Sequence, residues 1–188
     1  MLLDYAALAQ KSAILAADHY RAATNMTDRI AALMILAHRF PSSAETMEAL
    51  AHFEARFADT PLAMDKWFGA QATAPGQNAL ATVRALTTHK GFSFDNPNRM
   101  RALIGAFSTS NPTGFNRKDG GGYALLAESV LRIDRQNPQT ASRLLTAMRS
   151  WRSLEAVRKA KAREALSLIA QEKSLSTDVR DIVERMLG

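Results

Sequence analysis

The sequence contains no cysteine among its 188 residues. Without thiols the chain can form no disulfide, no thiolate zinc site and no cysteine nucleophile. It also has no long apolar run: the longest, residues 30–37, is much shorter than the roughly 20 residues that a membrane-spanning helix needs. The first residues lack the basic and apolar segments of a secretory signal. These absences lead us to expect a cytoplasmic protein with no membrane partner.

Aromatic and β-branched residues are scarce as well. Phe, Trp and Tyr make up 7% of the chain, and there are only seven Ile and five Val against 34 Ala and 21 Leu. This bias favours helices over sheets, and no segment alternates polar and apolar residues for long enough to predict a strand. With 188 residues, 47% of them hydrophobic, the chain can bury the core of one ordinary domain. We therefore predict an all-α fold.

Capping residues mark where the helices begin. Asn96 and Asn137 each stand before a proline, which suits the first position of a helix. Ser42 precedes Glu45 at the spacing of a capping box. Together with the helical period of the apolar residues, these starts predict about ten helices. The predicted helices cover residues 3–22, 27–38, 43–57, 61–74, 77–88, 97–109, 122–135, 138–149, 154–172 and 177–187.

The connections between these helices are short, which is typical of antiparallel helix pairs stacked as an α-solenoid of the armadillo or HEAT type. We expect residues 1–188 to form a single helical-repeat domain of this kind. One connection differs, because residues 110–122 form a long, glycine-rich and basic segment. Long loops in compact domains tend to be functional or mobile, and we expect the same of this one.

Catalytic and metal-binding motifs are missing from the sequence. No two of the four histidines are three or four residues apart, so no helical zinc site can form locally. Residues 119–122 are rich in glycine but lack the Lys-Ser/Thr pair of a phosphate-binding loop, and no Gly-x-Ser-x-Gly elbow is present. We therefore predict no catalytic residue, no metal ligand and no cofactor in this chain.

The net charge of +6 lies in the second half, where residues 95–188 contain 16 basic and 10 acidic side chains. Residues 151–163 carry five Lys or Arg against one Glu, and such a basic helix could follow nucleic-acid phosphates. However, no aromatic residues alternate with these cations to stack on bases, and Ala162, Leu166 and Ile169 give the helix a buried stripe. A nucleic-acid binder is one interpretation, but we expect no nucleic-acid partner.

Several segments of the sequence are similar to those of a known family. They are Asn25–Arg29, Asp65–Phe68, Gln71–Ala72, Asn96–Arg99, Arg101–Phe107, Asn111–Pro112, Phe115, Asp119–Gly120, Gly122–Tyr123 and Asn137–Gln139, followed by Ala141 and Arg143. In order, and over about residues 1–187, they resemble the C-terminal helical domain of the bacterial aminopeptidase N family, the alanyl aminopeptidases among the M1 zinc metallopeptidases. Two positions depart from the family pattern: Asn116 stands where the family often has histidine, and Gly121 where it often has serine.

The resemblance implies that the chain is the noncatalytic C-terminal segment of a larger zinc-dependent aminopeptidase, which removes N-terminal amino acids from peptides. The family's His-Glu-x-x-His helix, its distant glutamate ligand and its Gly-x-Met-Glu-Asn motif are absent from this sequence. In such enzymes a metal-activated water attacks the peptide bond, with a glutamate as general base. The helical domain would wall the substrate chamber and control access to it. Its implied partners are the upstream catalytic domain of the same polypeptide and peptide substrates.

The resemblance also places Gln139, Arg143 and Arg101 where the last domain of the family meets the substrate pocket. The spacing of the residues agrees with this. On the predicted helix 138–149 the apolar residues form one stripe, and Gln139 and Arg143 fall on the opposite side. Arg101 flanks the apolar stripe of its own helix and can therefore point out of the core. The main alternative is a free-standing helical-repeat adaptor that binds another protein along its concave face.

Overall fold

The computed structural model describes residues 2–188, and within that range it contains helices and no strand. The all-α prediction is confirmed. The α-helices are α1 (Leu2–Gln10), α2 (Ile14–Ala22), α3 (Met26–Arg39), α4 (Ala44–Phe57), α5 (Pro61–Ala72), α6 (Ala79–Leu86), α7 (Pro97–Met100), α8 (Ala106–Ser110), α9 (Pro112–Phe115), α10 (Gly121–Asp134), α11 (Pro138–Leu144), α12 (Ala156–Ala170) and α13 (Thr177–Leu187). A π-helical segment, η1 (Arg101–Gly105), joins α7 to α8, and the 3₁₀ segments η2 (Leu145–Met148) and η3 (Trp151–Ser153) follow α11. None of the helices in this range has the length and apolar character that crossing a membrane requires.

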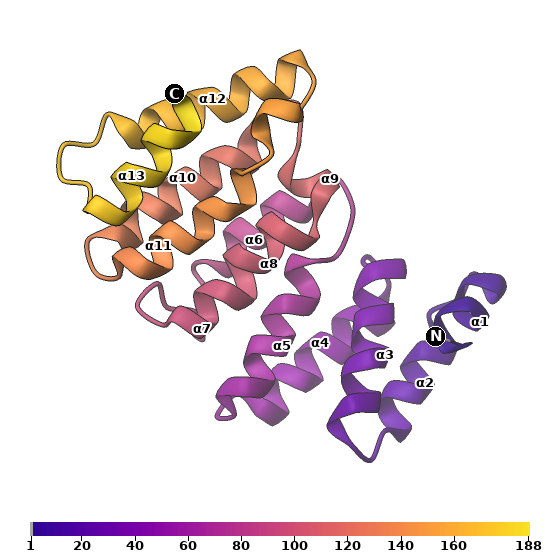
Figure 1. Ribbon diagram of the computed structural model, residues 1–188. Coiled ribbons are helices and arrows are strands. Elements are labelled where there is room, and N and C mark those ends of the chain that lie inside the picture. The colour runs from indigo at the N-terminus through magenta and orange to yellow at the C-terminus, as the bar shows by residue number, and fades with distance from the viewer. Residues whose placement is uncertain (1) are drawn as a thin grey trace.

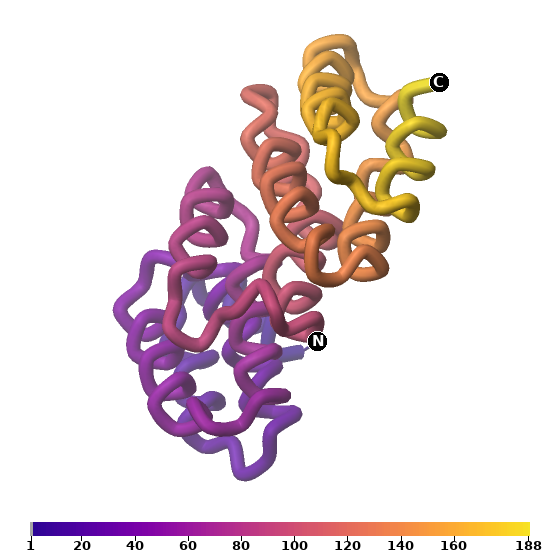
Figure 2. The backbone as a smooth tube through the Cα atoms, turned by 90° about the vertical axis from the view of Figure 1, so that its left-hand side faces the viewer, coloured from indigo at the N-terminus to yellow at the C-terminus, as the bar shows by residue number. Residues whose placement is uncertain are grey.

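The helices are stacked in chain order from one end of the molecule to the other. α2 packs on α3, α3 on α5, α10 on both α11 and α12, and α12 on α13. In Figure 1, α1 and α2 lie at one end of the array and α12 and α13 at the other. Figure 2 shows the backbone winding through successive helical turns between these ends. Elements that are close in sequence are therefore close in space, and the prediction of an α-solenoid is confirmed.

An apolar core runs along the stack between the helices. Five of the bulkiest fully buried side chains are aromatic, namely Phe53, Phe68, Phe107, Phe115 and Tyr123. The rings of Phe107 and Phe115 meet edge to face with centroids 6.1 Å apart, and those of Phe115 and Tyr123 meet in the same way at 5.2 Å. Edge-to-face contacts of this kind add stabilisation beyond the area that the rings bury. They join α8, α9 and α10, which lie beside the candidate site.

Most of the predicted helix starts agree with the structure. The side chains of Asn96 and Asn137 accept hydrogen bonds from backbone amides in the first turns of α7 and α11. The predicted capping box at the start of α4 is wrong by one residue. Ser43, and not Ser42, is the cap, and its hydroxyl accepts a hydrogen bond of 3.2 Å from the amide of Thr46.

The prediction of one helix over residues 3–22 is wrong, because the chain turns a corner between α1 and α2. Lys11 has a φ of 48°, a left-handed conformation through which an α-helix cannot continue. The hydroxyl of Ser12 then accepts a hydrogen bond of 3.2 Å from the amide of Ile14 at the start of α2. Helices on both sides of the corner bury small residues such as Ala7 and Ala16, so the apolar pattern does not mark the break.

The predicted helix over residues 97–109 is present, but it is not α-helical throughout. α7 and α8 form one continuous rod, but η1 lies between them and contains one π-helical turn. A π turn inserts an extra residue into the helical repeat and changes the direction of the side chains that follow it. This turn begins at Arg101, one of the predicted chamber residues.

The segment over residues 110–122 is not the free loop that its composition predicts. Its beginning folds into α9, and the buried side chain of Asn111 holds that short helix in place. The Asn111 amide group donates to the carbonyls of Ala72 and Ala74 at 3.0 and 2.8 Å, and its oxygen accepts from the amide of Gly114 at 3.1 Å. The connection is therefore packed into the fold.

Candidate functional site

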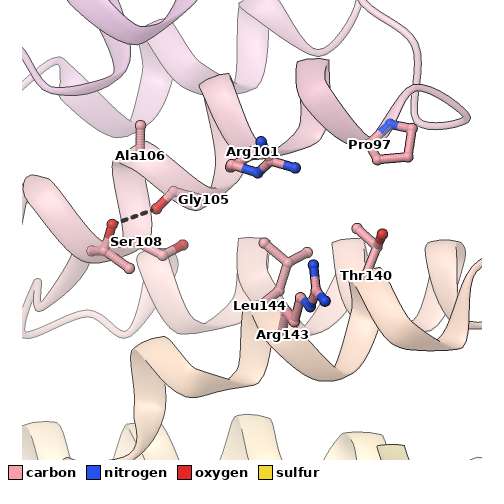
Figure 3. A pocket seen from close by; sticks show the side chains of 9 residues that line it. Pro97, Arg101, Gly105, Ala106, Ser108, Thr140, Arg143 and Leu144 are labelled. Atoms are coloured by element: carbon pink, nitrogen blue, oxygen red, sulfur yellow. Dashed lines mark hydrogen bonds between the residues drawn. The ribbon is translucent and has the colours of Figure 1, made fainter.

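A pocket of about 440 Å³ lies between the rod formed by α7, η1 and α8 and the neighbouring helix α11 (Figure 3). This volume is within the range of small-ligand sites in proteins. The residues that line the pocket are Pro97, Arg101, Gly105, Ala106, Ser108, Thr109, Thr140, Arg143 and Leu144. The lining contains two arginines and no acidic residue, so the pocket is electropositive.

Arg101 and Arg143 face this pocket because the opposite sides of their helices are buried. Next to Arg101, the side chains of Met100, Leu103 and Ile104 are fully buried in the core. Near Arg143, the predicted apolar stripe is confirmed, because all four of its residues are buried: Ala141, Leu144, Leu145 and Met148. Figure 3 shows the two guanidinium groups in the space between the helices, one from each side. The fold therefore brings together two residues that are far apart in the sequence.

Neither arginine of the pocket is neutralised by the part of the chain that the structure describes. No carboxylate of residues 2–188 lies within 4.0 Å of the side-chain nitrogens of Arg101 or Arg143, and neither guanidinium donates a hydrogen bond within that range. Both side chains are exposed. Each guanidinium therefore keeps its donors for a ligand, and the planar fork of an arginine matches the geometry of a carboxylate.

Gln139 lies beside the pocket and does not line it. It is exposed on α11, four residues before Arg143 and so about one turn away on the same face of the helix. The prediction that Gln139 and Arg143 point away from the core is confirmed by their exposure. The structure thus brings Arg101 and Arg143 into one pocket, with Gln139 at its border.

Several other residues of the lining were not selected by sequence analysis. Gly105 lines the pocket where the two helices meet, and a Cβ added there would lie at ordinary contact distances of 3.7 Å from Cγ of Arg101 and 3.8 Å from Cδ2 of Leu144. A glycine within a helical pattern is the one signal that could have identified this position. Nothing in the sequence marks Ser108 and Thr109 as pocket residues. In the structure each hydroxyl donates to a backbone carbonyl of its own helix at 2.8 Å.

No cluster of metal ligands exists among residues 2–188: no group of three or more histidine and acidic side chains is placed to hold an ion. The histidines that make hydrogen bonds have structural partners. Nε2 of His38 lies 3.0 Å from Oγ1 of Thr73, and Nε2 of His89 lies 3.1 Å from a carboxylate oxygen of Glu54. Burial lowers the pKa of His38. These contacts give His38 and His89 a structural role.

The basic stretch of residues 151–163 is partly neutralised where it lies on α12. Arg158 pairs with Glu155 at 2.9 Å and also donates to the carbonyl of Asn116 at 2.5 Å. Lys161 pairs with Glu164 at 2.8 Å. Cations that are already paired have fewer donors for phosphates, so this surface lends little support to the interpretation as a nucleic-acid binder.

Comparison with known proteins gives one family model that matches residues 1–188, described as "Domain of unknown function (DUF3458_C) ARM repeats". Aminopeptidase N of Escherichia coli (strain K12) is 38% identical over 176 residues, which cover 93% of this chain and 20% of that protein. Aminopeptidase N of Haemophilus influenzae is 34% identical over 187 residues, which cover 100% of this chain and 21% of that protein.

Among solved structures, the fold is similar to that in the crystal structure of Legionella pneumophila aminopeptidase A in complex with aspartic acid. The TM-score is 0.88 at 29% sequence identity, over 95% of this chain and 21% of that chain. The chain spans about a fifth of the length of these relatives. Its stacked helices and the match over its whole length lead to one conclusion: the chain belongs to the DUF3458_C family of ARM-repeat domains.

Proposed function

We propose that this chain is the noncatalytic C-terminal domain of a cytoplasmic, zinc-dependent aminopeptidase of the M1 class. In this proposal the domain walls the chamber in which the enzyme removes N-terminal amino acids from peptides, and it controls access to that chamber. Its partners are the catalytic domain of the same polypeptide and the peptide substrate. The zinc ion and its general base belong to the part of the polypeptide outside this chain, because residues 2–188 contain no group that fits a metal ion.

The pocket between η1 and α11 is the observation that carries this proposal. It holds two guanidinium groups that have no acidic partner among the described residues, next to apolar surface from Ala106 and Leu144. An apolar lining with a few convergent polar groups is the usual composition of a ligand site. The similarity to aminopeptidases supports a peptide as the ligand.

Within this proposal the three chamber residues have separate roles. Arg101 and Arg143 hold the carbonyls or the terminal carboxylate of a peptide, because arginine offers several donors in one plane. Gln139 is neutral and lies at the border of the pocket, so we assign it to the selection of the N-terminal residue. None of the three takes part in breaking the peptide bond. They act by binding and orienting the substrate.

The decisive experiment measures the kinetics of the full-length protein that contains this chain, with Arg101→Ala and Arg143→Ala as single substitutions. A lost hydrogen bond to a charged group is worth about 1.5–3 kcal/mol, or roughly ten- to a hundredfold in kcat/KM. Solvent in an open pocket should bring the effect toward the lower end. The loss should be larger for a tetrapeptide than for an amino-acyl arylamide, which has no downstream carboxylate.

Arg163→Ala is a matched control, since Arg163 is exposed on α12 and does not line the pocket. It should leave both substrates unchanged. Gln139→Ala should change the preference among N-terminal residues more than the dependence on peptide length. Equal kcat/KM values for wild type and all variants on both substrates, with stability intact, would leave the domain with a structural role or with that of an adaptor.

A further inference from the structure

A second pocket, of about 300 Å³, lies between α2, α3 and α4. In Figure 1 these helices lie toward the N-terminal end of the stack, away from α7, α8 and α11, which hold Arg101 and Arg143 between them. Its lining is unusually rich in charged and polar groups of both signs. The residues that line it are Ala17, Tyr20, Arg21, Arg29, Glu45, Glu48, Ala49, His52 and Arg56. The proposed function makes no use of this pocket.

Arg29 is the most unusual residue of the lining, because its charge is buried without a counter-ion. The residue is only 9% exposed. Its guanidinium donates to the carbonyl of Ala23 and lies 5.5 Å from the centroid of the Tyr20 ring. No carboxylate of the described chain lies within 4.0 Å of it. Burying a charge is costly unless it is paired, so a ligand that brings an anionic group to Arg29 would be favoured.

Tyr20 adds a second buried polar group to the same wall. Its hydroxyl forms a hydrogen bond of 2.8 Å with Nδ1 of His52, which joins α2 to α4 across the pocket. Burial raises the pKa of the Tyr20 hydroxyl above its usual value. Arg21 contributes less to the charge of the pocket, because it pairs with Asp18 at 2.6 Å. The basic groups available to a ligand are therefore Arg29 and Arg56.

Helix α4 separates the charges of the pocket along its length. Glu45, Glu48, His52 and Arg56 follow one another on one face, with the acidic residues in the first turns and the arginine near the end. From Glu48 to Arg56 the helix rises about 12 Å, at 1.5 Å per residue. Within the described residues, no ion pair is formed by Glu45, Glu48 or Arg56. One end of the pocket is thus acidic and the other is basic.

We propose that this pocket binds a short zwitterionic peptide, with its carboxylate at Arg29 and Arg56 and its ammonium group at Glu45 and Glu48. A simple anion would be repelled by the two glutamates, and a simple cation by the two arginines. An extended chain covers about 3.3–3.6 Å per residue, so the charged ends of a tripeptide are about 10 Å apart. That separation is comparable with the rise of about 12 Å from Glu48 to Arg56 along α4. The proposal is independent of the proposed function, since it concerns other residues.

The test is a calorimetric titration of triglycine, in parallel, into the 188-residue chain and into the full-length protein that contains it. We expect saturable binding to both. Arg56→Gln and Glu48→Gln remove exposed charges that form no ion pair in the described chain, so the fold should be kept. Each should weaken triglycine binding by about three- to fivefold, as expected for a solvent-accessible ion pair. Arg163→Gln, on α12, changes the net charge as Arg56→Gln does and should have no effect.

Blocked peptides assign each charge to its end of the pocket. Triglycine amide should bind more weakly than triglycine and should not respond to Arg56→Gln. N-acetyl-triglycine should likewise not respond to Glu48→Gln. Absence of saturable binding, or equal affinities in wild type and both variants, would overturn the proposal. Binding to the 188-residue chain that is lost in the full-length protein would overturn it too, because the charges would then belong to an interface within the enzyme.

Discussion

Arg99 donates a hydrogen bond of 2.5 Å to Asp65, and this ion pair joins α7 to α5 in the interior of the solenoid. The same guanidinium donates to the carbonyl of Pro61 at 3.2 Å and lies 5.2 Å from the centroid of the Phe68 ring. Arg101 follows only two residues later, at the start of the π turn. The ion pair therefore fixes the part of the rod from which Arg101 reaches its pocket.

Replacing Arg99 with alanine should lower the free energy of unfolding by about 2–3 kcal/mol. Breaking a buried ion pair costs about 3–5 kcal/mol, because the remaining charge stays buried, and the partial exposure of Asp65 should reduce this cost. Unfolding in urea, followed by circular dichroism, measures the change. Arg163→Ala, on the surface of α12, should change stability by less than about 0.5 kcal/mol. Similar stabilities for the two variants would contradict the role given to the ion pair.

The stability of the chain should depend on pH through His38. Burial lowers the pKa of this histidine below its usual value of about 6.5. The unfolded chain then binds the proton more readily than the folded one, so the contribution of His38 is complete above pH 6.5 and decreases as the pH falls. His38→Gln should remove that part of the dependence. Urea unfolding at pH 7.5 and pH 5 compares the two proteins.

His19 provides the control for this measurement, since it is exposed and makes no side-chain hydrogen bond within residues 2–188. His19→Gln should keep the pH dependence of the wild type. If His38→Gln also kept it, the dependence would have to come from another group, and the influence of burial on His38 would be refuted.

Composition and spacing were enough to predict the fold class and most of the helices. Alanine and leucine outnumber the β-branched residues, and caps such as Asn96 and Asn137 mark helix starts that the structure contains. The corner at Lys11 could not be predicted, because a non-glycine residue adopts a positive φ only when the surrounding packing holds it there. The π turn at Arg101 could not be predicted either, because no residue pattern in the sequence marks it.

The candidate site was only partly accessible from the sequence. Helical spacing predicted that Arg101 and Arg143 leave the core, and both are exposed. That they share one pocket depends on the packing of α11 on α10 and of α10 on α6 and α9, which no pattern within a single helix contains. The burial of the unpaired charge of Arg29 could not be predicted either, because it depends on the tertiary structure.

Removing metal ions should leave the stability of the 188-residue chain unchanged. No group of metal ligands exists in the described part of the chain, and apolar burial between the helices explains its folding. Thermal unfolding with and without an excess of EDTA should give the same Tm in one cooperative transition. A substantial fall of Tm in the chelator would show that a bound ion contributes to the fold.

Gly122→Ala should destabilise the chain severely. A Cβ at this position would lie 2.1 Å from the carbonyl oxygen of Phe115, a backbone atom that cannot move aside cheaply. Relieving the overlap would separate α10 from α9, and overpacking of this kind costs about 1–3 kcal/mol or more. A low yield of soluble protein or a Tm several degrees lower would agree with this prediction. An unchanged Tm would mean that the two helices can separate freely.

Gly105→Ala should weaken the proposed binding of peptides without destabilising the domain. The added methyl group would meet Arg101 and Leu144 at ordinary van der Waals distances of 3.7 and 3.8 Å, so the fold has room for it. Replacing a helical glycine with alanine favours the helix by about 0.5–1 kcal/mol, and the free energy of unfolding should stay equal or rise slightly.

The same methyl group would lie against Arg101 and Leu144 in the wall of the pocket and would narrow it. In the full-length protein, kcat/KM for a tetrapeptide should fall by up to roughly tenfold, the lower end of what one methylene is worth in a binding pocket. The kcat/KM for an amino-acyl arylamide should fall less, because this shorter substrate does not reach as far into the pocket. Gly69→Ala is the matched control: its added Cβ would meet only the carbonyl oxygen of Ala102, at 3.6 Å, and Gly69 does not line the pocket. If both variants kept full activity on the tetrapeptide, peptides would not pass between Arg101 and Arg143, and the pocket would have to serve another ligand.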